Sequence, residues 1–219
     1  MYKNVIKRLF DIVLSGVGIV VLAIPMLIIA IAIKIDDPGP VLFKQKRVGQ
    51  KKNGKITYFM IWKFRSMKMS TPHDTPTHLL ENPEQYITRL GRFIRKTSLD
   101  ELPQIYQVFT SKLSVIGPRP ALWSQDDLIA EREKYGANDI KPGITGWAQI
   151  NGRDELEIDV KAKFDGEYVA ALNAGSLQGF VMDMKCFFGT IVSVLKSDGV
   201  VEGGTGEMKK QEKAQKQEI

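Results

Sequence analysis

The sequence has very few of the side chains that build disulfides or metal sites. Its 219 residues include one cysteine, Cys186, and two histidines, His73 and His78. A single cysteine cannot form an intramolecular disulfide, which favours a reducing compartment. Metal sites usually gather several Cys, His or carboxylate ligands, and both histidines lie in a Thr- and Pro-rich stretch, "STPHDTPTHLLENP". A histidine-based metal site is therefore not expected.

The glycine-rich loops of the common nucleotide-binding folds are also missing. The sequence contains no Walker pattern, and no GxGxxG motif follows a predicted strand. Lys and Arg number 31 against 25 Asp and Glu, which gives a net charge of +6. This modest excess suits a partner that carries phosphate, such as nucleic acid, an anionic membrane surface or a nucleotide substrate.

One long segment, residues 12–33, carries no charge at all. At about 1.5 Å per residue, a helix of this length could just cross a hydrocarbon core about 30 Å thick. Pro25 removes a backbone hydrogen bond inside the run, so a kink or break is expected there. By the positive-inside rule, both ends belong on the cytoplasmic side, because basic residues flank the run almost evenly: Lys3, Lys7, Arg8, Lys34, Lys44, Lys46 and Arg47.

Two membrane arrangements remain open on these residues alone. One is a re-entrant helix–break–helix that dips into a single leaflet, and the other is an ordinary spanning anchor with a kinked helix. Asp11 lies at the edge of the run and is expected to pair with Lys7 or Arg8. A cleaved signal peptide is disfavoured, because the run is long and lacks a small-x-small cleavage site.

Downstream patterns predict a β-hairpin followed mainly by helices, which is an α+β fold. The expected hairpin arms are residues 41–48 and 56–64, and Asn53-Gly54 tolerates the positive φ of a turn. Helices are expected over residues 86–95, 102–113, from about 124, over 154–168 and over 182–196. The last has an apolar face broad enough for a core or a membrane surface. The expected organisation is a membrane element over 1–36, a main domain over 37–200, and a polar, disordered tail over 201–219.

The stretch "TSLDELPQI" has two interpretations. Ser98 followed three residues later by Glu101 is a capping-box pattern, in which acidic residues only stabilise a helix start. Alternatively, Asp100 and Glu101 are adjacent carboxylates that act as a nucleophile or as magnesium ligands. The nearby cations Arg95 and Lys96 and a helix N-terminus would favour the ionised carboxylates, which argues against a general acid with a raised pKa.

Three further clusters suit phosphate, and each has a structural alternative. Lys63 and Arg65 in "WKFRSM" alternate along a strand, so they are expected on one face, which could also be an ordinary solvated face. Prolines flank Arg119 in "GPRP" and fix its backbone, either for phosphate recognition or for pairing with a carboxylate. "KPGITGWAQINGR" ends in Arg153; its glycines and Trp147 could approach an anion and stack on a base or sugar, or simply pack.

These motifs, in this order, resemble those of the bacterial sugar transferases, the monotopic phosphoglycosyl transferases that begin polysaccharide and glycoprotein glycan assembly. The matching segments are "KRLFD" before a Pro-broken apolar run, "WKFRSM", "SLDELPQ", "IGPRP" and "KPGITGWAQINGR". The resemblance covers roughly residues 1–200. It is to the small version of the family, a catalytic core without the additional N-terminal membrane domain of larger relatives.

The resemblance implies transfer of a sugar-1-phosphate from a UDP-sugar to a polyprenol (undecaprenyl) phosphate, with release of UMP. This is the first membrane step of polysaccharide or glycoconjugate assembly. By the same resemblance, Asp100 is the nucleophile that forms a covalent phosphosugar intermediate, and Glu101 helps to hold a Mg²⁺ ion that screens the diphosphate. The residues expected to bind substrate are Arg95 and Arg119, at phosphate-contacting positions, and Lys63, Arg65 and Arg153, at further motif positions.

The resemblance also implies a place in the cell. We expect a re-entrant membrane helix and amphipathic interfacial helices at the bacterial inner (cytoplasmic) membrane, around an active site that faces the cytoplasm. The expected partners are a UDP-sugar, polyprenyl phosphate and membrane lipids, without nucleic acid; a homodimer is left open. The alternative is a catalytically silent, membrane-anchored scaffold of a glycan assembly complex. Two positions depart from the family pattern: Ile24 replaces a serine before Pro25, and Ser111-Lys112 replaces Gly-Asp.

Overall fold

The structure, a computed structural model, describes residues 2–71, 83–152 and 156–196. Over these ranges the chain is mainly helical with two small β-sheets, which confirms the expected α+β class. The tail expected over 201–219, both histidines and Arg153 lie outside the described residues.

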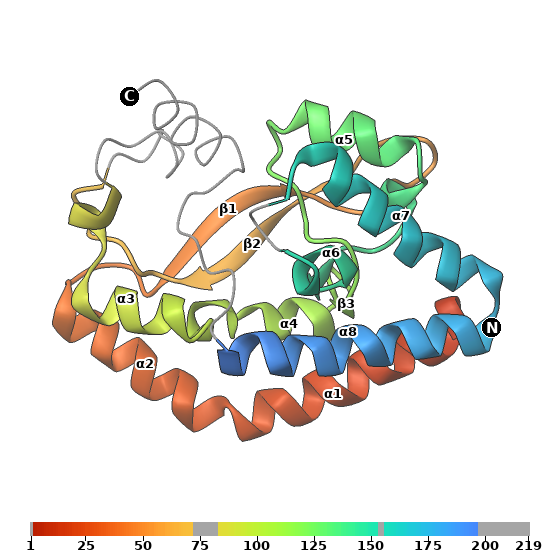
Figure 1. Cartoon of the computed structure of the whole chain (residues 1–219). Coiled ribbons are helices and arrows are strands. Elements are labelled where there is room, and N and C mark those ends of the chain that lie inside the picture. Colours follow the sequence, from red (N-terminus) through yellow and green to blue (C-terminus); the bar gives the residue numbers. More distant parts are fainter. Residues whose placement is uncertain (1, 72–82, 153–155, 197–219) are drawn as a thin grey trace.

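Two N-terminal helices form one edge of the molecule and meet at a sharp bend (Figure 1). A π-helical turn, Tyr2–Ile6, leads into α1 (Lys7–Val21), and α2 (Ala23–Asp36) follows with a bend of 59°. Pro25 lies in the first turn of α2, where its missing N–H and its ring prevent α1 from continuing. The expected break is therefore confirmed. Within the described ranges no single helix is long and apolar enough to cross a membrane; only this bent pair could, by length and composition.

The predicted hairpin follows. Strands β1 (Leu42–Val48) and β2 (Tyr58–Phe64) pair antiparallel, with Leu42 opposite Phe64 and Val48 opposite Tyr58. Asn53 and Gly54 have φ values of 51° and 74°, as the turn chemistry predicted. The hairpin runs above the short helices that carry the central part of the chain (Figure 1).

Short helices and a second sheet make up most of the remaining fold. In chain order they are the 3₁₀ turn Pro83–Tyr86, α3 (Arg89–Lys96), the 3₁₀ turn Leu99–Glu101, α4 (Gln104–Phe109), β3 (Ser114–Ile116), α5 (Asp126–Glu133), the 3₁₀ turn Ala137–Asp139, β4 (Gly143–Thr145), α6 (Trp147–Ile150), α7 (Ile158–Ala174) and α8 (Ser176–Lys196). The helix expected over 102–113 is shorter than predicted, and the one expected over 182–196 begins earlier.

The second sheet pairs segments that are far apart in the sequence. Strands β3 and β4 run parallel, with Ser114 opposite Gly143 and Ile116 opposite Thr145. A Cβ on Gly143 would lie 2.1 Å from the backbone nitrogen of Gly117, so only glycine fits. This glycine of "KPGITGW" therefore allows two backbones to approach each other, and the packing interpretation of that position holds.

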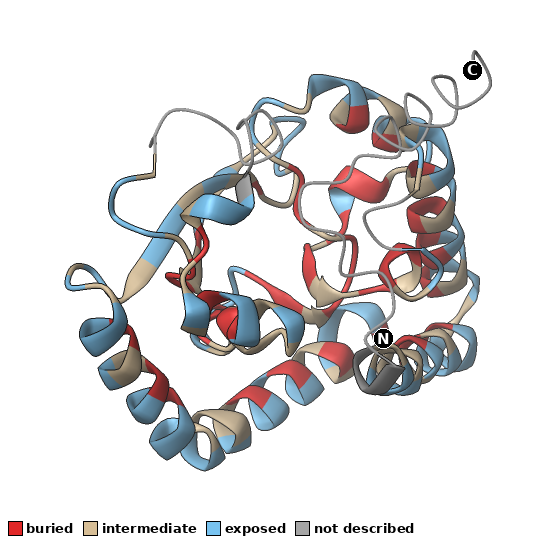
Figure 2. Ribbon diagram, turned by 60° about the vertical axis from the view of Figure 1, so that its left-hand side comes forward, coloured by how far each residue is buried: buried red, intermediate tan, exposed pale blue. Residues whose placement is uncertain are grey.

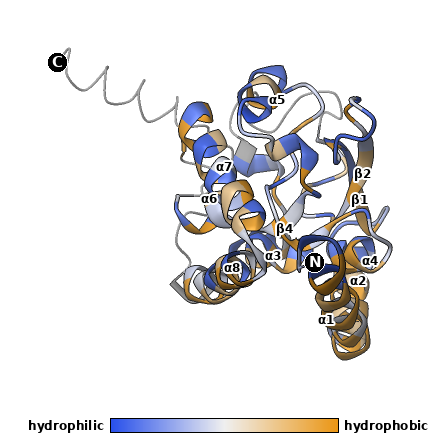
Figure 3. Ribbon diagram, turned by 90° about the vertical axis from the view of Figure 1, so that its right-hand side faces the viewer, coloured by the Kyte–Doolittle hydropathy of each residue, from blue (hydrophilic) through white to orange (hydrophobic). Residues whose placement is uncertain are grey.

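The N-terminal helices pack on the domain with one face only. Met26, Ile29 and Ile33 of α2 are buried against Phe64 and Ile94. In Figure 2 the buried residues of both helices lie on the side that faces the rest of the molecule, and Figure 3 shows that the pair is strongly hydrophobic. The large apolar side chains that remain exposed include Leu9, Val13, Val17, Val20, Ile24, Leu27, Ile28, Ile31 and Ile35.

Asp11 is hydrogen-bonded to β3 and not to a cation of its own helix. Its Oδ1 accepts hydrogen bonds from Ser114 Oγ at 3.0 Å and from the Val115 backbone nitrogen at 2.8 Å. Lys7 and Arg8 are bonded to other parts of the chain. The expected pairing of Asp11 with Lys7 or Arg8 is therefore wrong, because β3 offers better aligned donors.

Candidate active site

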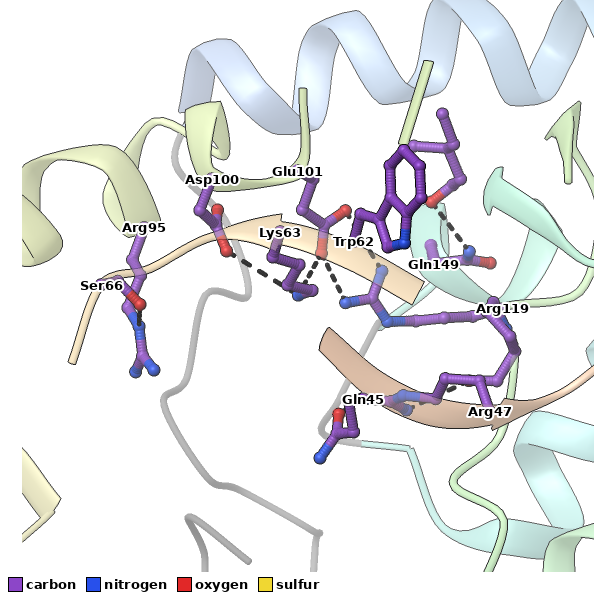
Figure 4. Close-up of polar contacts among 12 residues, drawn as sticks. Gln45, Arg47, Trp62, Lys63, Ser66, Arg95, Asp100, Glu101, Arg119 and Gln149 are labelled. Carbon is purple, nitrogen blue, oxygen red and sulfur yellow. Dashed lines mark hydrogen bonds and ion pairs between the residues drawn. The ribbon is translucent and has the colours of Figure 1, made fainter. Parts of the chain in front are cut away.

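Asp100 and Glu101 lie in the 3₁₀ turn between α3 and α4, and both side chains point toward β2 (Figure 4). Ser98, before the turn, has φ of 56°, and its side chain makes no N-cap hydrogen bond. Helix α4 begins only at Gln104. The capping-box interpretation is therefore wrong: the two carboxylates are presented by an irregular connection and not by the start of an α-helix.

Glu101 is held by two cations. Its Oε1 accepts hydrogen bonds from Lys63 Nζ and from Arg119 Nη2, each at 2.7 Å, and Arg119 Nη1 lies 3.4 Å from Oε2. Burial alone would raise the pKa of Glu101, but the charges and hydrogen bonds of Arg119 and Lys63 outweigh it and hold that pKa well below its usual range. Glu101 is therefore a fixed negative charge that positions Lys63 and Arg119.

Asp100 has a different environment although it is the next residue. It is 8% exposed, and its closest charged partner is Lys63 Nζ, 3.7 Å from Oδ2. Burial raises the pKa of Asp100 and the charge of Glu101 adds to this, while Lys63, Arg95 and Arg119 only partly offset it. The direction is opposite to the expected one. Across the described ranges its carboxylate accepts no hydrogen bond, so both oxygens are available for chemistry.

Arg95 approaches the pair from the other side. In Figure 4 it lies beyond Asp100, away from Arg119. Its Nε donates a hydrogen bond to Ser66 Oγ at 2.7 Å, which anchors the long side chain near the end of β2. Three cations, Lys63, Arg95 and Arg119, thus surround two carboxylates, and such an excess of positive charge suits an anionic ligand.

Arg65 is engaged elsewhere. It follows the last residue of β2 and is 9% exposed. Its guanidinium donates to the Asp37 carboxylate at 2.9 Å and to the Asp37 carbonyl oxygen, and it thereby fastens the end of α2. The structure therefore does not bring Arg65 to the carboxylate pair with Lys63. Sequence reasoning missed Asp37 and Ser66, because no local pattern links either of them to its arginine partner.

A cavity of about 170 Å³ opens beside Glu101 and Arg119. Its walls are mainly apolar, from α4, α6 and α8, and include Leu102 and Ile105. Gln149 lines it as well; its Nε2 lies 3.5 Å from the Ile144 carbonyl oxygen, and its buried Oε1 has no partner in the described part of the chain. The cavity therefore joins a charged end to an apolar interior.

Comparison with known proteins shows the family of this chain. The profile of the family described as bacterial sugar transferase matches residues 2–197. The chain belongs to the bacterial sugar transferase family. The match includes all the segments on which the resemblance was based.

Several relatives of this sugar transferase are of very different lengths. The UDP-glucose:undecaprenyl-phosphate glucose-1-phosphate transferase of Escherichia coli (strain K12) is 39% identical over 180 residues, which are 76% of this chain but 36% of that protein. The uncharacterized sugar transferase EpsL of Bacillus subtilis (strain 168) is 36% identical over 196 residues, 90% of each chain. The exopolysaccharide production protein PSS of Rhizobium leguminosarum bv. phaseoli is 38% identical over 198 residues, 87% of this chain and 96% of that protein. The chain thus spans little more than a third of the first relative and nearly all of the other two.

The carboxylate pair of this sugar transferase suits magnesium only together with a ligand. In the described ranges no group of three or more His, Cys, Asp or Glu side chains could hold a metal ion. Mg²⁺ is commonly bound by one or two carboxylates plus substrate phosphates. Asp100 offers unbonded oxygens, whereas the oxygens of Glu101 already face Lys63 and Arg119. The donor set therefore fits an ion that arrives with a diphosphate, and not one held by the protein alone.

Proposed function

We propose that this protein transfers a sugar-1-phosphate from a UDP-sugar to a polyprenyl phosphate, with release of UMP, through a covalent intermediate on Asp100. The names of relatives support the substrate class: they include a UDP-glucose:undecaprenyl-phosphate glucose-1-phosphate transferase and an undecaprenyl-phosphate galactose phosphotransferase. The observation that carries the proposal is the difference in contacts between the two adjacent carboxylates, Asp100 and Glu101. Glu101 is saturated by cations, while the neighbouring Asp100 keeps its oxygens unbonded among three positive side chains.

The first half-reaction would form a bond from an Asp100 carboxylate oxygen to the β-phosphorus of the UDP-sugar. The bond from that phosphorus to the oxygen bridging the two phosphates breaks, and UMP leaves with that oxygen. In the second half-reaction an oxygen of the polyprenyl phosphate attacks the same phosphorus. The bond to Asp100 then breaks, which regenerates the carboxylate and releases the polyprenyl diphosphate sugar.

The cations supply the charge that the diphosphate needs. Lys63 and Arg119 are already oriented by Glu101, so little reorganisation is required when phosphate oxygens arrive between them. Arg95 lies on the far side of Asp100, where it can bind the transferred phosphate. Asp100 and, as the family resemblance implies, Glu101 would help to hold a Mg²⁺ ion together with the diphosphate, and that ion would supply charge screening for the phosphates. Substrate contacts by Arg65 and Arg153 stay predictions of the family resemblance.

The bent N-terminal pair supports a re-entrant placement in the membrane. Its outer faces carry exposed apolar side chains from Leu9 to Ile35, and both of its ends are polar and fixed to the domain through Asp11 and Asp37. With both ends on one side, the active site would face the cytoplasm at the bacterial inner membrane. Exposed apolar residues of α8, such as Phe188 and Val192, would then rest at the interface.

The proposal is tested by identifying the released nucleotide. Purified full-length protein in detergent or nanodiscs, given polyprenyl phosphate, Mg²⁺ and a panel of UDP-sugars that includes UDP-glucose and UDP-galactose, is expected to release UMP with at least one of them. Asp100→Asn should abolish release, since an amide is a very poor nucleophile. Asp126→Asn, at an exposed aspartate of α5, is the matched control and should retain activity.

Two results would contradict the proposal. Release of UDP would indicate an ordinary glycosyl transfer to lipid, and full activity of Asp100→Asn would remove the assigned nucleophile. If the folded protein releases UMP from no UDP-sugar, the result would favour the alternative of a catalytically silent scaffold.

A further inference from the structure

A second cavity, of about 260 Å³, lies beside the start of α1. Figure 1 shows that α1 starts at one end of the molecule. The cavity is formed by the start of α1, the residues after α4 and the segment before β4, and it shares no lining residue with the cavity beside Glu101. Its charged lining residues are Lys3, Lys7, Arg8, Asp11, Asp139 and Lys141. Cations thus outnumber carboxylates in the wall.

Most of these charges already have partners. Asp11 Oδ1 accepts from Ser114 and Val115, as described above, and Asp139 forms an ion pair with Lys51 at 3.4 Å. Lys7 forms an ion pair with Asp183 at 2.9 Å. The two carboxylates of the wall are therefore committed to other groups and do not form ion pairs with the remaining cations.

Arg8 and Lys141 form no ion pair within the described residues. Arg8 donates hydrogen bonds to the carbonyl oxygens of Val108 and Phe109, both at 2.8 Å, which orient the guanidinium without cancelling its charge. Lys141 is half-buried, and within the described residues its ammonium has neither a hydrogen bond nor an ion pair. Burial lowers the pKa of Lys141 and the charge of Arg8 lowers it further, while the charge of Asp11 offsets only part of this shift. A half-buried, unpaired cation is unfavourable, so an anion in this cavity would be stabilised.

The surroundings of the cavity indicate which anion. One turn after Arg8 on the same face of α1, Ile12 is 39% exposed, and the exposed side chains of Leu9 and Val13 continue this apolar surface around the helix. A phosphodiester headgroup in the cavity could therefore leave its acyl chains against this face. Inorganic phosphate offers the same charge but nothing for the apolar face.

We infer that this cavity binds the phosphate of an anionic glycerophospholipid headgroup. Lys141 and Arg8 would contact the phosphate, and the apolar face of α1 would contact the chains. The site would fix the N-terminal end of the bent pair at headgroup depth. The inference depends on the membrane placement of α1 and is independent of the chemistry at Asp100, so the two can fail separately.

The test measures lipid binding by the full chain released from neutral detergent, using native mass spectrometry. Phosphatidylglycerol and phosphatidylcholine with the same acyl chains are titrated in turn. We expect preferential binding of phosphatidylglycerol, weakened about fivefold by Lys141→Gln, since one basic residue near an anionic lipid contributes about that factor. Lys141→Arg should restore binding, and Lys163→Gln, at an exposed lysine of α7, should leave it unchanged.

A second readout locates the lipid and distinguishes the anion's source. Acetylation of Lys141 by an amine-reactive reagent should be suppressed by phosphatidylglycerol and not by phosphatidylcholine. Protection by millimolar inorganic phosphate to the same extent would mean that the cavity takes free phosphate, and it would overturn the lipid assignment. Equal effects of Lys141→Gln and Lys163→Gln, or equal binding of the two lipids, would overturn the site itself.

Discussion

At the level of single residues, the proposed chemistry depends on the different environments of two adjacent carboxylates. Burial opposes ionisation of both, yet Glu101 accepts direct hydrogen bonds from Lys63 and Arg119, whereas the cation nearest to Asp100, Lys63, lies 3.7 Å away. The pKa of Glu101 is accordingly lowered and that of Asp100 raised. A raised pKa also means a more basic and hence more nucleophilic carboxylate, provided that it is ionised at the working pH.

This difference predicts a pH effect. Asp100 must be deprotonated to attack, so kcat should fall as the pH drops through its raised pKa. The charge of Lys63 lowers that pKa, and Lys63→Met should therefore move the acid limb of the kcat profile to higher pH, whatever it does to the maximal rate. Lys55→Met, at an exposed lysine of the hairpin turn, should leave the limb in place. An acid limb that does not move in Lys63→Met would show that Lys63 does not act on Asp100.

The residue types in the motifs predicted which residues belong to the site, but they did not predict the contacts that these residues make. The identities of Asp100, Glu101, Lys63 and Arg119 follow from motifs, and the structure brings these four together. The direction of the Asp100 pKa could not be predicted, because it depends on burial, which results from the packing of the whole chain. The partner of Arg65 was missed for the same reason.

At the level of helices and strands, sequence patterns predicted the elements that depend on residues close together in the chain. The hairpin arms follow from β-rich runs around Asn53-Gly54, and the break follows from Pro25. The parallel pairing of β3 with β4 has no local signal, since it joins segments that are distant in sequence and depends on backbone contact at Gly143. The false capping box at Ser98 shows the opposite error, in which a local pattern is overridden by tertiary packing.

The break at Pro25 predicts that both ends of the α1–α2 pair lie on the same side of the membrane. Lys3→Cys and Pro38→Cys, made separately, should both react with a membrane-impermeant maleimide from the cytoplasmic side only; the native Cys186 is buried and should stay silent. Adding Pro25→Ala restores the backbone donor and removes the cost of about 3 kcal/mol that a proline would impose on one continuous helix through this point. A fraction of the Lys3→Cys and Pro38→Cys chains should then become labelled at opposite faces. Ile24→Ala keeps the proline and should not change the labelling. Opposite labelling in the parent protein would mean a true span.

At the scale of the whole molecule, one buried carboxylate joins the two ends of the described chain. Asp183 of α8 accepts hydrogen bonds from Tyr2 at 2.6 Å, Tyr168 at 2.7 Å and Lys7 at 2.9 Å. The side chains of Lys7 and Asp183 are 10% and 3% exposed. Because α1 begins in this network, the N-terminal helices are fixed to α7 and α8 of the described chain.

Breaking this network should cost stability. Asp183→Asn leaves the Lys7 ammonium buried without a counter-charge, and we expect a loss of about 3–5 kcal/mol in the free energy of unfolding, measured by denaturant titration in detergent. The double variant Lys7→Met with Asp183→Asn should recover part of this loss, because no unpaired charge remains. Unchanged stability of Asp183→Asn would show that the ion pair does not support the fold.

The proposed function requires a covalent bond between Asp100 and the transferred phosphosugar, and peptide mass spectrometry can detect this bond. The protein is incubated with the UDP-sugar that supports UMP release, without polyprenyl phosphate, then quenched and digested. We expect one sugar-phosphate adduct on Asp100, absent from Asp100→Asn and discharged when polyprenyl phosphate is added. Turnover without any protein-bound phosphosugar, or an adduct on Glu101, would contradict it.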